Sequence, residues 1–208
     1  MQELELADLL ITATRPSALD RLGLGWDDLH RKFPRLCHVA IVGYPPPFEN
    51  EPGHDLTYQA KYGLLTPPHM PRTLIADMAG AEMAASEGLA LLLARERGQD
   101  SGYTLVALSD AAEYMAEPWK AGATAPGAIL GGGVPEYNIY EASDGWIAVA
   151  ALEPHFKRNL EKVLECEAKS REALSPIFKT KTAQEWQQWA SEIDLPIVAI
   201  NTKKPEVR

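Results

Sequence analysis

LADLLIT at residues 6–12 and LCHVAIV at residues 36–42 are the two apolar runs that decide the fold. Runs of this length predict buried strands, and between them Pro16 opens a helical stretch that runs to Lys32. This order of strand, helix and strand predicts a parallel βαβ unit, and YTLVALS at residues 103–109 adds a further strand. The first part of the chain is therefore expected to be an α/β domain with a partial Rossmann-like parallel sheet.

Two proline-bearing loops follow the predicted strands. Residues 43–53, GYPPPFENEPG, leave the carboxyl end of one strand, which is where open α/β sheets bind their ligands. The second loop, at residues 66–72, precedes a long helix rich in Ala and Leu, with Asp77 in its N-cap region. Since such loops gather at one edge of a parallel sheet, the residues that follow them are expected to line one cleft.

The composition changes after residue 120 to AGATAPGAILGGG, which packs little side-chain volume and predicts a linker. We expect three parts, namely a large α/β domain at residues 1–120, a linker at 121–135 and a small α+β domain at 136–208. The small domain is expected to begin with a β-hairpin. Two helices should follow near residues 154–168 and 182–193, the second opened by a capping box of Thr182 and Glu185.

Charge and composition exclude several classes of protein. The formal net charge of −9 argues against a general binder of nucleic acids, so an anionic ligand must meet a local basic cluster. Cys37 and Cys166 lie far apart without metal-ligand spacing, so neither a zinc site nor a disulfide scaffold is expected. No apolar run approaches the ~20 residues that a bilayer crossing needs, which predicts a soluble, cytoplasmic protein without membrane contact.

Five segments occur in an order that is specific in combination: ADLLITATRPSALDRLGLGWDDL, PRLCHVAIVGY, GHDLTYQAKYG, LIADMAGAEMAASEGLALLLARERG and LGGGVPEYNIYEASDGWIAVAALEPHF. Together they resemble the class III CoA-transferase (CaiB/BaiF) family, and most closely its α-methylacyl-CoA racemase branch. The His in the third segment is the form that the racemase branch uses. The resemblance implies a coenzyme A thioester as substrate and no metal or redox cofactor.

The chain also departs from the family pattern. Family members are much longer, so the resemblance predicts a chain truncated at both ends, without the N-terminal strands and their nucleotide-binding residues. Because family members form interlinked dimers and an exposed sheet edge needs cover, we expect a homodimer. The glycine-rich run that follows the family's Asp is here Met78, Ala79, Gly80 and Ala81.

The resemblance places the active site at His54, Asp77 and Glu153. A racemase needs two acid/base groups that flank one carbon, and a neutral imidazole and a protonated carboxyl suit these tasks. Glu153 would orient the imidazole. Each residue also has an ordinary interpretation, because His54 follows Gly in a loop, Asp77 could be an N-cap and Glu153 could be a first-turn carboxylate. Asp55, next to His54, could cap its own loop.

Three arginines are candidates to bind the phosphates of coenzyme A, because guanidinium groups grip phosphate oxygens in pairs. Arg15 and Arg21 match basic positions of the family, and Arg72 lies near the expected site in sequence. The leading hypothesis is exchange of the α-proton of a 2-methyl-branched or similar acyl-CoA. One alternative is CoA transfer between carboxylic acids with Asp77 as nucleophile, which Gln59 and Ala60 favour. The other is a non-catalytic CoA-binding or interaction protein.

Overall fold

The computed structural model describes residues 2–164 and 170–202, so Cys166 lies outside the described residues. The chain divides into two compact units, Met1–Glu117 and Pro118–Arg208. Among the described residues, no helix is both long and apolar enough to cross a membrane. The same residues contain no group of three or more His, Cys, Asp or Glu side chains that could hold a metal ion.

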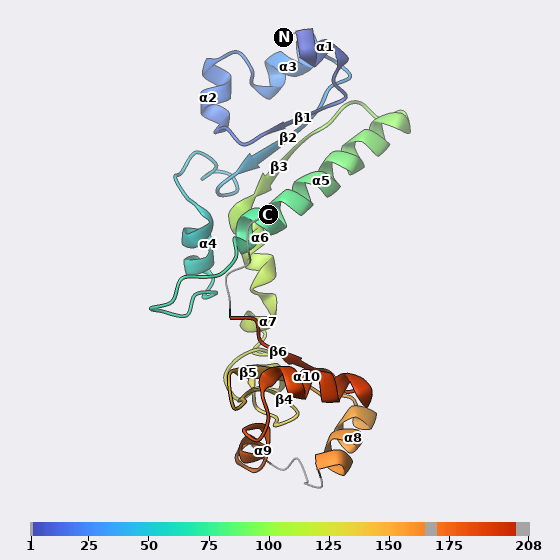
Figure 1. Cartoon of the computed structure of the whole chain (residues 1–208). Coiled ribbons are helices and arrows are strands. Elements are labelled where there is room, and N and C mark those ends of the chain that lie inside the picture. Colours follow the sequence, from blue (N-terminus) through green and yellow to red (C-terminus); the bar gives the residue numbers. More distant parts are fainter. Residues whose placement is uncertain (1, 165–169, 203–208) are drawn as a thin grey trace. The chain divides into compact units, whose positions relative to one another are not determined.

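The first unit is built on a parallel three-stranded sheet, as the sequence predicts. Its strands β1 (Leu9–Thr12), β2 (Cys37–Val42) and β3 (Tyr103–Ala107) lie in the order β1-β2-β3. Figure 1 shows the long helix α5 (Ile75–Glu96) beside this sheet. Successive side chains of β2 point to opposite faces of the sheet. Val39 lies in the core on the face that α5 covers, and His38 lies on the opposite face, near Trp26.

The helical stretch between β1 and β2 is two helices rather than one, which corrects the prediction. Helix α2 (Pro16–Arg21) and helix α3 (Trp26–Lys32) are separated by a turn in which Gly23 has a φ of +65°. A left-handed residue ends a helix, because its carbonyl no longer points along the helix axis. Apolar periodicity continues across the turn, so periodicity alone does not show the break. A short helix α1 (Gln2–Leu6) precedes β1.

Helix α5 approaches the sheet closely because its inner face is made of small residues. Ala76, Gly80, Ala84 and Gly88 recur every four positions and are all buried. A Cβ atom on Gly88 would lie 2.8 Å from Leu9 Cδ2, which shows how little room remains between helix and strand. Helix α4 (Asp55–Lys61) precedes α5, and helix α6 (Leu108–Met115) follows β3.

The second unit contains an antiparallel sheet of order β4-β5-β6 with helices around a core. The predicted hairpin and capping box are present, since β4 pairs with β5 and Thr182 Oγ1 accepts from Glu185 N at 3.2 Å. Helix α9 and strand β6 were not predicted. The elements are α7 (Glu117–Lys120), η1 (Ile129–Gly131), β4 (Tyr137–Glu141), β5 (Trp146–Ala150), α8 (Pro154–Leu164), α9 (Arg171–Phe178), α10 (Ala183–Glu192) and β6 (Ile197–Ala199).

Candidate active site

A cavity of about 350 Å³ lies at the carboxyl end of β2, where the sequence places a ligand site. His54 and Asp77 both line it, although helix α4 and the loop after it separate them in the sequence. Arg15 lines it as well, from the N-terminal end of α2. The other lining residues are Ala13, Ile41, Val42, Gly43, Glu49, Glu51, Gly53, Tyr58 and Leu108.

His54 is held through its backbone. It is the N-cap residue of α4, and its N–H donates to Thr57 Oγ1 at 3.1 Å. The Thr57 hydroxyl in turn donates to the His54 carbonyl at 2.8 Å. Both backbone polar groups of His54 are therefore engaged locally, while its side chain lies exposed on the cavity. An imidazole that is positioned in this way is free to act on a bound ligand.

Asp55 turns away from the cavity and caps the neighbouring helix. Its side chain is 4% exposed, and Oδ1 accepts from Ala76 N at 2.8 Å and from Asp77 N at 3.1 Å. The Gln59 amide donates to the other carboxylate oxygen. Asp77 is therefore not the N-cap of α5, which corrects the sequence interpretation. The residue at that position is Leu74, and the capping carboxylate comes from α4.

Asp77 is the third residue of α5 and is partly buried. Burial raises the pKa of its carboxyl first, and the negative charge of Asp55 raises it further, while His54 opposes the shift. Both larger effects disfavour a second negative charge at this place. Asp77 therefore keeps its proton to a higher pH than an ordinary aspartic acid, which is the property that a proton donor needs.

Tyr58 forms one wall of the cavity and fits against two glycines. Its side chain is 1% exposed and packs edge-on against Tyr44, with ring centroids 5.2 Å apart. Burial, with Tyr44 and Asp77 next, raises the pKa of the phenol. Gly43 and Gly53 face this ring so closely that a Cβ atom on either would come within 2.6 Å of the hydroxyl oxygen.

The remaining predicted residues do not line this cavity. Arg21 is exposed at the end of α2, and Arg72 is exposed in the loop before α5. Glu153 belongs to the second unit, where it is exposed and its carbonyl accepts from Lys157 N at 3.0 Å. Its expected contact with His54 stays a prediction.

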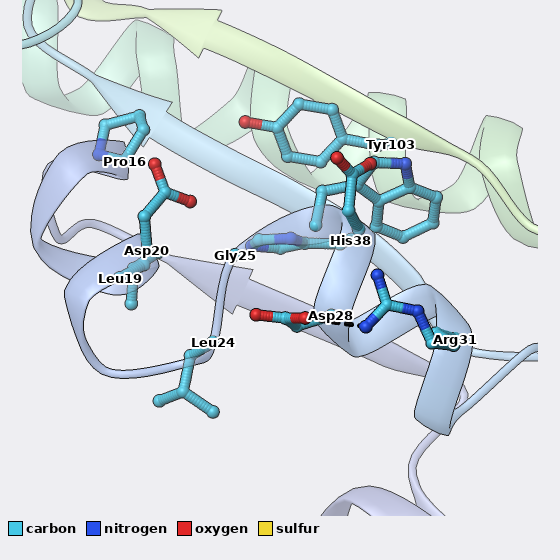
Figure 2. Close-up of a pocket in the computed structure, with 11 residues that line it drawn as sticks. Pro16, Leu19, Asp20, Leu24, Gly25, Asp28, Arg31, His38 and Tyr103 are labelled. Carbon is cyan, nitrogen blue, oxygen red and sulfur yellow. Dashed lines mark hydrogen bonds and ion pairs between the residues drawn. The ribbon is translucent and has the colours of Figure 1, made fainter.

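Another cavity of the first unit, of about 470 Å³, lies under α2 and α3. Figure 2 shows Asp20 and Asp28 at this cavity, with the ion pair between Asp28 and Arg31. His38 and Tyr103 line it from the sheet. Three aspartates and one arginine give the cavity the same charge sign as a phosphate group, so it is poorly suited to coenzyme A.

A third cavity, of about 640 Å³, is apolar and lies along α5 and α6. Met78 lines it, whereas the preceding residue Asp77 lines the cavity of His54, so the two cavities lie on neighbouring faces of the first turn of α5. Its other lining residues are mainly apolar: Thr73, Ile75, Ala79, Ala81, Glu82, Met83, Tyr114 and Met115. A hollow of this kind can take up a hydrocarbon group.

Comparison with known proteins identifies relatives over nearly the whole chain. The family model of CoA-transferase family III matches residues 4–205. A CaiB/baiF CoA-transferase family protein of Caenorhabditis elegans is 28% identical, over 88% of this chain and 62% of its own length. The alpha-methylacyl-CoA racemase of Mus musculus is 27% identical, over 94% of this chain and 60% of its own length. The chain thus spans less than two thirds of these relatives.

A solved structure shows the same fold. The crystal structure of a hypothetical protein from Mycobacterium tuberculosis superimposes with a TM-score of 0.80 at 24% identity. The match covers 97% of this chain and 64% of that chain.

Proposed function

The chain belongs to CoA-transferase family III, and on that premise we propose that it exchanges the α-proton of an acyl-CoA thioester, as a racemase or epimerase does. The observation that supports this most is that His54 and Asp77 line one cavity, in which burial and the charge of Asp55 raise the pKa of Asp77. An acid and a base on one cavity are what inversion at a carbon next to a carbonyl requires.

The proton transfers follow from these two side chains. Neutral His54 takes the α-proton from one face of the thioester and becomes an imidazolium, which leaves an enolate. Asp77 then donates its proton to the opposite face of the carbon and becomes a carboxylate. Proton exchange with solvent or the reverse reaction restores both groups. Each positioned acid or base contributes about 10²- to 10⁴-fold to such a rate.

Substrate binding is assigned by charge and polarity. The apolar cavity beside Met78 suits a branched acyl group, because it lies next to the turn that carries Asp77. Arg15 is the arginine that lines the His54 cavity, so we assign it, with Arg21 at the far end of α2, to the phosphates of coenzyme A. Glu153 remains our candidate for orienting the imidazole, and self-association remains our expectation for the assembled protein.

CoA transfer is the second candidate, since relatives of this chain include CoA-transferases. In that reaction the Asp77 carboxylate attacks the thioester carbonyl and expels the CoA thiolate, which gives a mixed anhydride. The thiolate then attacks the Asp77 carbonyl, releases the first carboxylic acid as its carboxylate and leaves an aspartyl-CoA thioester, from which the acceptor carboxylate takes CoA by the reverse steps. Gln59, which favoured transfer in the sequence, is fully buried and donates to Asp55 and to the Thr73 carbonyl. Its presence therefore has a structural reason that is independent of the reaction. The raised pKa of Asp77 also favours a proton donor over a resting nucleophile.

The decisive experiment measures deuterium incorporation from solvent at the α-carbon of a 2-methyl-branched acyl-CoA. Asp77→Asn should keep the fold and CoA binding but lower the exchange rate by roughly 10²-fold or more. Asp100→Asn, at an exposed position, is the matched control. A hydroxylamine-sensitive covalent intermediate that disappears in Asp77→Asn would indicate transfer instead. No change in thermal stability on adding CoA or acetyl-CoA would favour the non-catalytic interaction protein.

A further inference from the structure

We propose that Asp55 is the positioning residue of the proton donor, because its buried carboxylate anchors the first turn of α5 and places a negative charge beside Asp77. The inference rests on the proposed function, in which Asp77 donates a proton. Asp55 itself faces away from the cavity and is absent from its lining, so it acts through Asp77 and not on the ligand.

Three donors converge on the Asp55 carboxylate. Two are the backbone N–H groups of Ala76 and Asp77, at 2.8 and 3.1 Å from Oδ1, and the third is the Gln59 side-chain amide. The two backbone contacts join residues that are 21 and 22 positions apart in the sequence. The first N–H groups of a helix lack partners within the helix, so a carboxylate placed against them is stabilised by both hydrogen bonds and the helix dipole.

This arrangement ties the two reacting side chains together. Asp55 follows His54 directly in the chain and holds the backbone N–H of Asp77, so the imidazole and the carboxyl share one rigid connection. Leu74, at the N-cap position of α5, has no side-chain acceptor that could replace Asp55. A displacement of Asp55 would therefore move the donor relative to the base.

The charge of Asp55 acts on Asp77 from a place that solvent cannot screen well. Burial and the charge of Asp55 raise the pKa of Asp77, and His54 lowers it. Around the cavity, Tyr58 lies on α4, Glu49 and Glu51 on the preceding loop, and Arg15 at the start of α2. Asp55 stands out from this group because it hydrogen-bonds to the backbone of Asp77 itself.

Asp55→Asn separates the charge from the geometry. The Asn side-chain oxygen can still accept from the N–H groups of Ala76 and Asp77. Its new N–H₂ group meets Gln59, whose Oε1 atom is buried without a partner among the described residues and can accept after the Gln59 amide turns over. The variant thus removes the negative charge while the two backbone hydrogen bonds to the start of α5 remain possible, although the turned Gln59 amide gives up its bond to the Thr73 carbonyl.

The test combines the pH profile of α-proton exchange with an NMR titration of the Asp77 carboxyl, assigned by its loss in Asp77→Asn. In Asp55→Asn the titration of the Asp77 carboxyl should move to lower pH. The exchange rate near neutral pH should fall roughly tenfold, which is less than the full contribution of a positioned acid because Asp77 itself is still present. Asp55→Ala should in addition lower the thermal stability, and Asp100→Asn should change neither measurement.

An unchanged Asp77 titration in a folded Asp55→Asn variant would overturn the inference, because Asp55 would then be a helix cap only. A fall in rate that is equal at all pH values, without a shift of the titration, would overturn it too. The titration does not depend on turnover, so it tests the effect of Asp55 even if the wild-type protein exchanges no α-proton. Failure of the proposed function is thereby separable from failure of this inference.

Discussion

Gly43→Ala should lower the stability of the first unit, and adding Tyr58→Phe should restore that stability. The reason is that the added methyl group clashes with one atom, the Tyr58 hydroxyl oxygen. A Cβ atom on Gly43 would lie 2.6 Å from the Tyr58 hydroxyl oxygen, whereas the next ring atom, Cζ, is 3.6 Å away. Carbon atoms in good contact are about 3.5–4.0 Å apart. The added methyl group therefore has to displace a buried aromatic residue, and overpacking of this kind costs about 1–3 kcal/mol.

Gly53→Ala is the matched control for the rescue. A Cβ atom on Gly53 would lie 2.6 Å from Tyr58 Cε1 and 2.8 Å from Cζ, so the ring itself obstructs it and not only the hydroxyl. Removing the hydroxyl should therefore leave most of the destabilisation of Gly53→Ala in place. We expect a coupling free energy of about 1–2 kcal/mol between positions 43 and 58, and a much smaller one between positions 53 and 58.

Hydrogen exchange of amides in β2 and α5, followed by mass spectrometry in increasing urea, reports on the first unit alone. The single variants at positions 43 and 53 should both lose protection, and Tyr58→Phe should restore it only for Gly43→Ala. Equal rescue of the two glycine variants would refute the reasoning, as would an unaltered stability of Gly43→Ala.

Three further predictions follow from titration and capping. Burial lowers the pKa of the His38 imidazole from 6.5. The neutral imidazole therefore makes its full contribution to the free energy of unfolding above pH 6.5, and this contribution is lost as the pH falls through the lowered pKa. His38→Gln should make the free energy of unfolding depend less on pH in this range. The pKa of Asp77 is raised from 3.8, so the protonated carboxyl contributes fully to the free energy of unfolding below that pH, and the contribution is lost as the pH rises. Asp77→Asn should therefore become more stable relative to wild type in thermal melts as the pH goes from acidic to neutral. Thr182→Ala should lower the unfolding free energy of the second unit by about 1 kcal/mol in urea, and Thr182→Ser should not.

The elements that the sequence predicts are those with strong local signals. Helix α5 is long and ends before Gly98, and the α10 capping box is complete within four residues. Two of the elements that were missed have weak local signals or depend on distant partners. Strand β6 has three residues and exists through its pairing with β5, and α4 lies in a segment that carries site residues and no apolar periodicity.

The candidate site likewise contains a part that the sequence predicted and a part that it did not. Because loops at the carboxyl edge of a parallel sheet lie close together, the sequence predicted that His54 and Asp77 line one cleft. Both residues line the cavity at the end of β2. Asp55 could be seen as a cap from its residue type, but not as the cap of α5, because that contact joins residues 21 positions apart. A sequence signal for it would need covariation with the start of α5.

Under the proposed function, the charges of the site indicate how a coenzyme A thioester would enter it. Glu49 and Glu51 line the His54 cavity together with Asp77, and Arg15 is the one arginine or lysine among its lining residues. Phosphate groups placed deep in this cavity would meet carboxylates in a poorly screened environment, at a cost that one arginine cannot offset. The thioester carries no net charge and can approach His54 and Asp77 without that cost. We therefore expect the phosphates to stay at the rim near α2, where Arg15 precedes the helix and the exposed Arg21 ends it, while only the acyl end reaches the reacting groups.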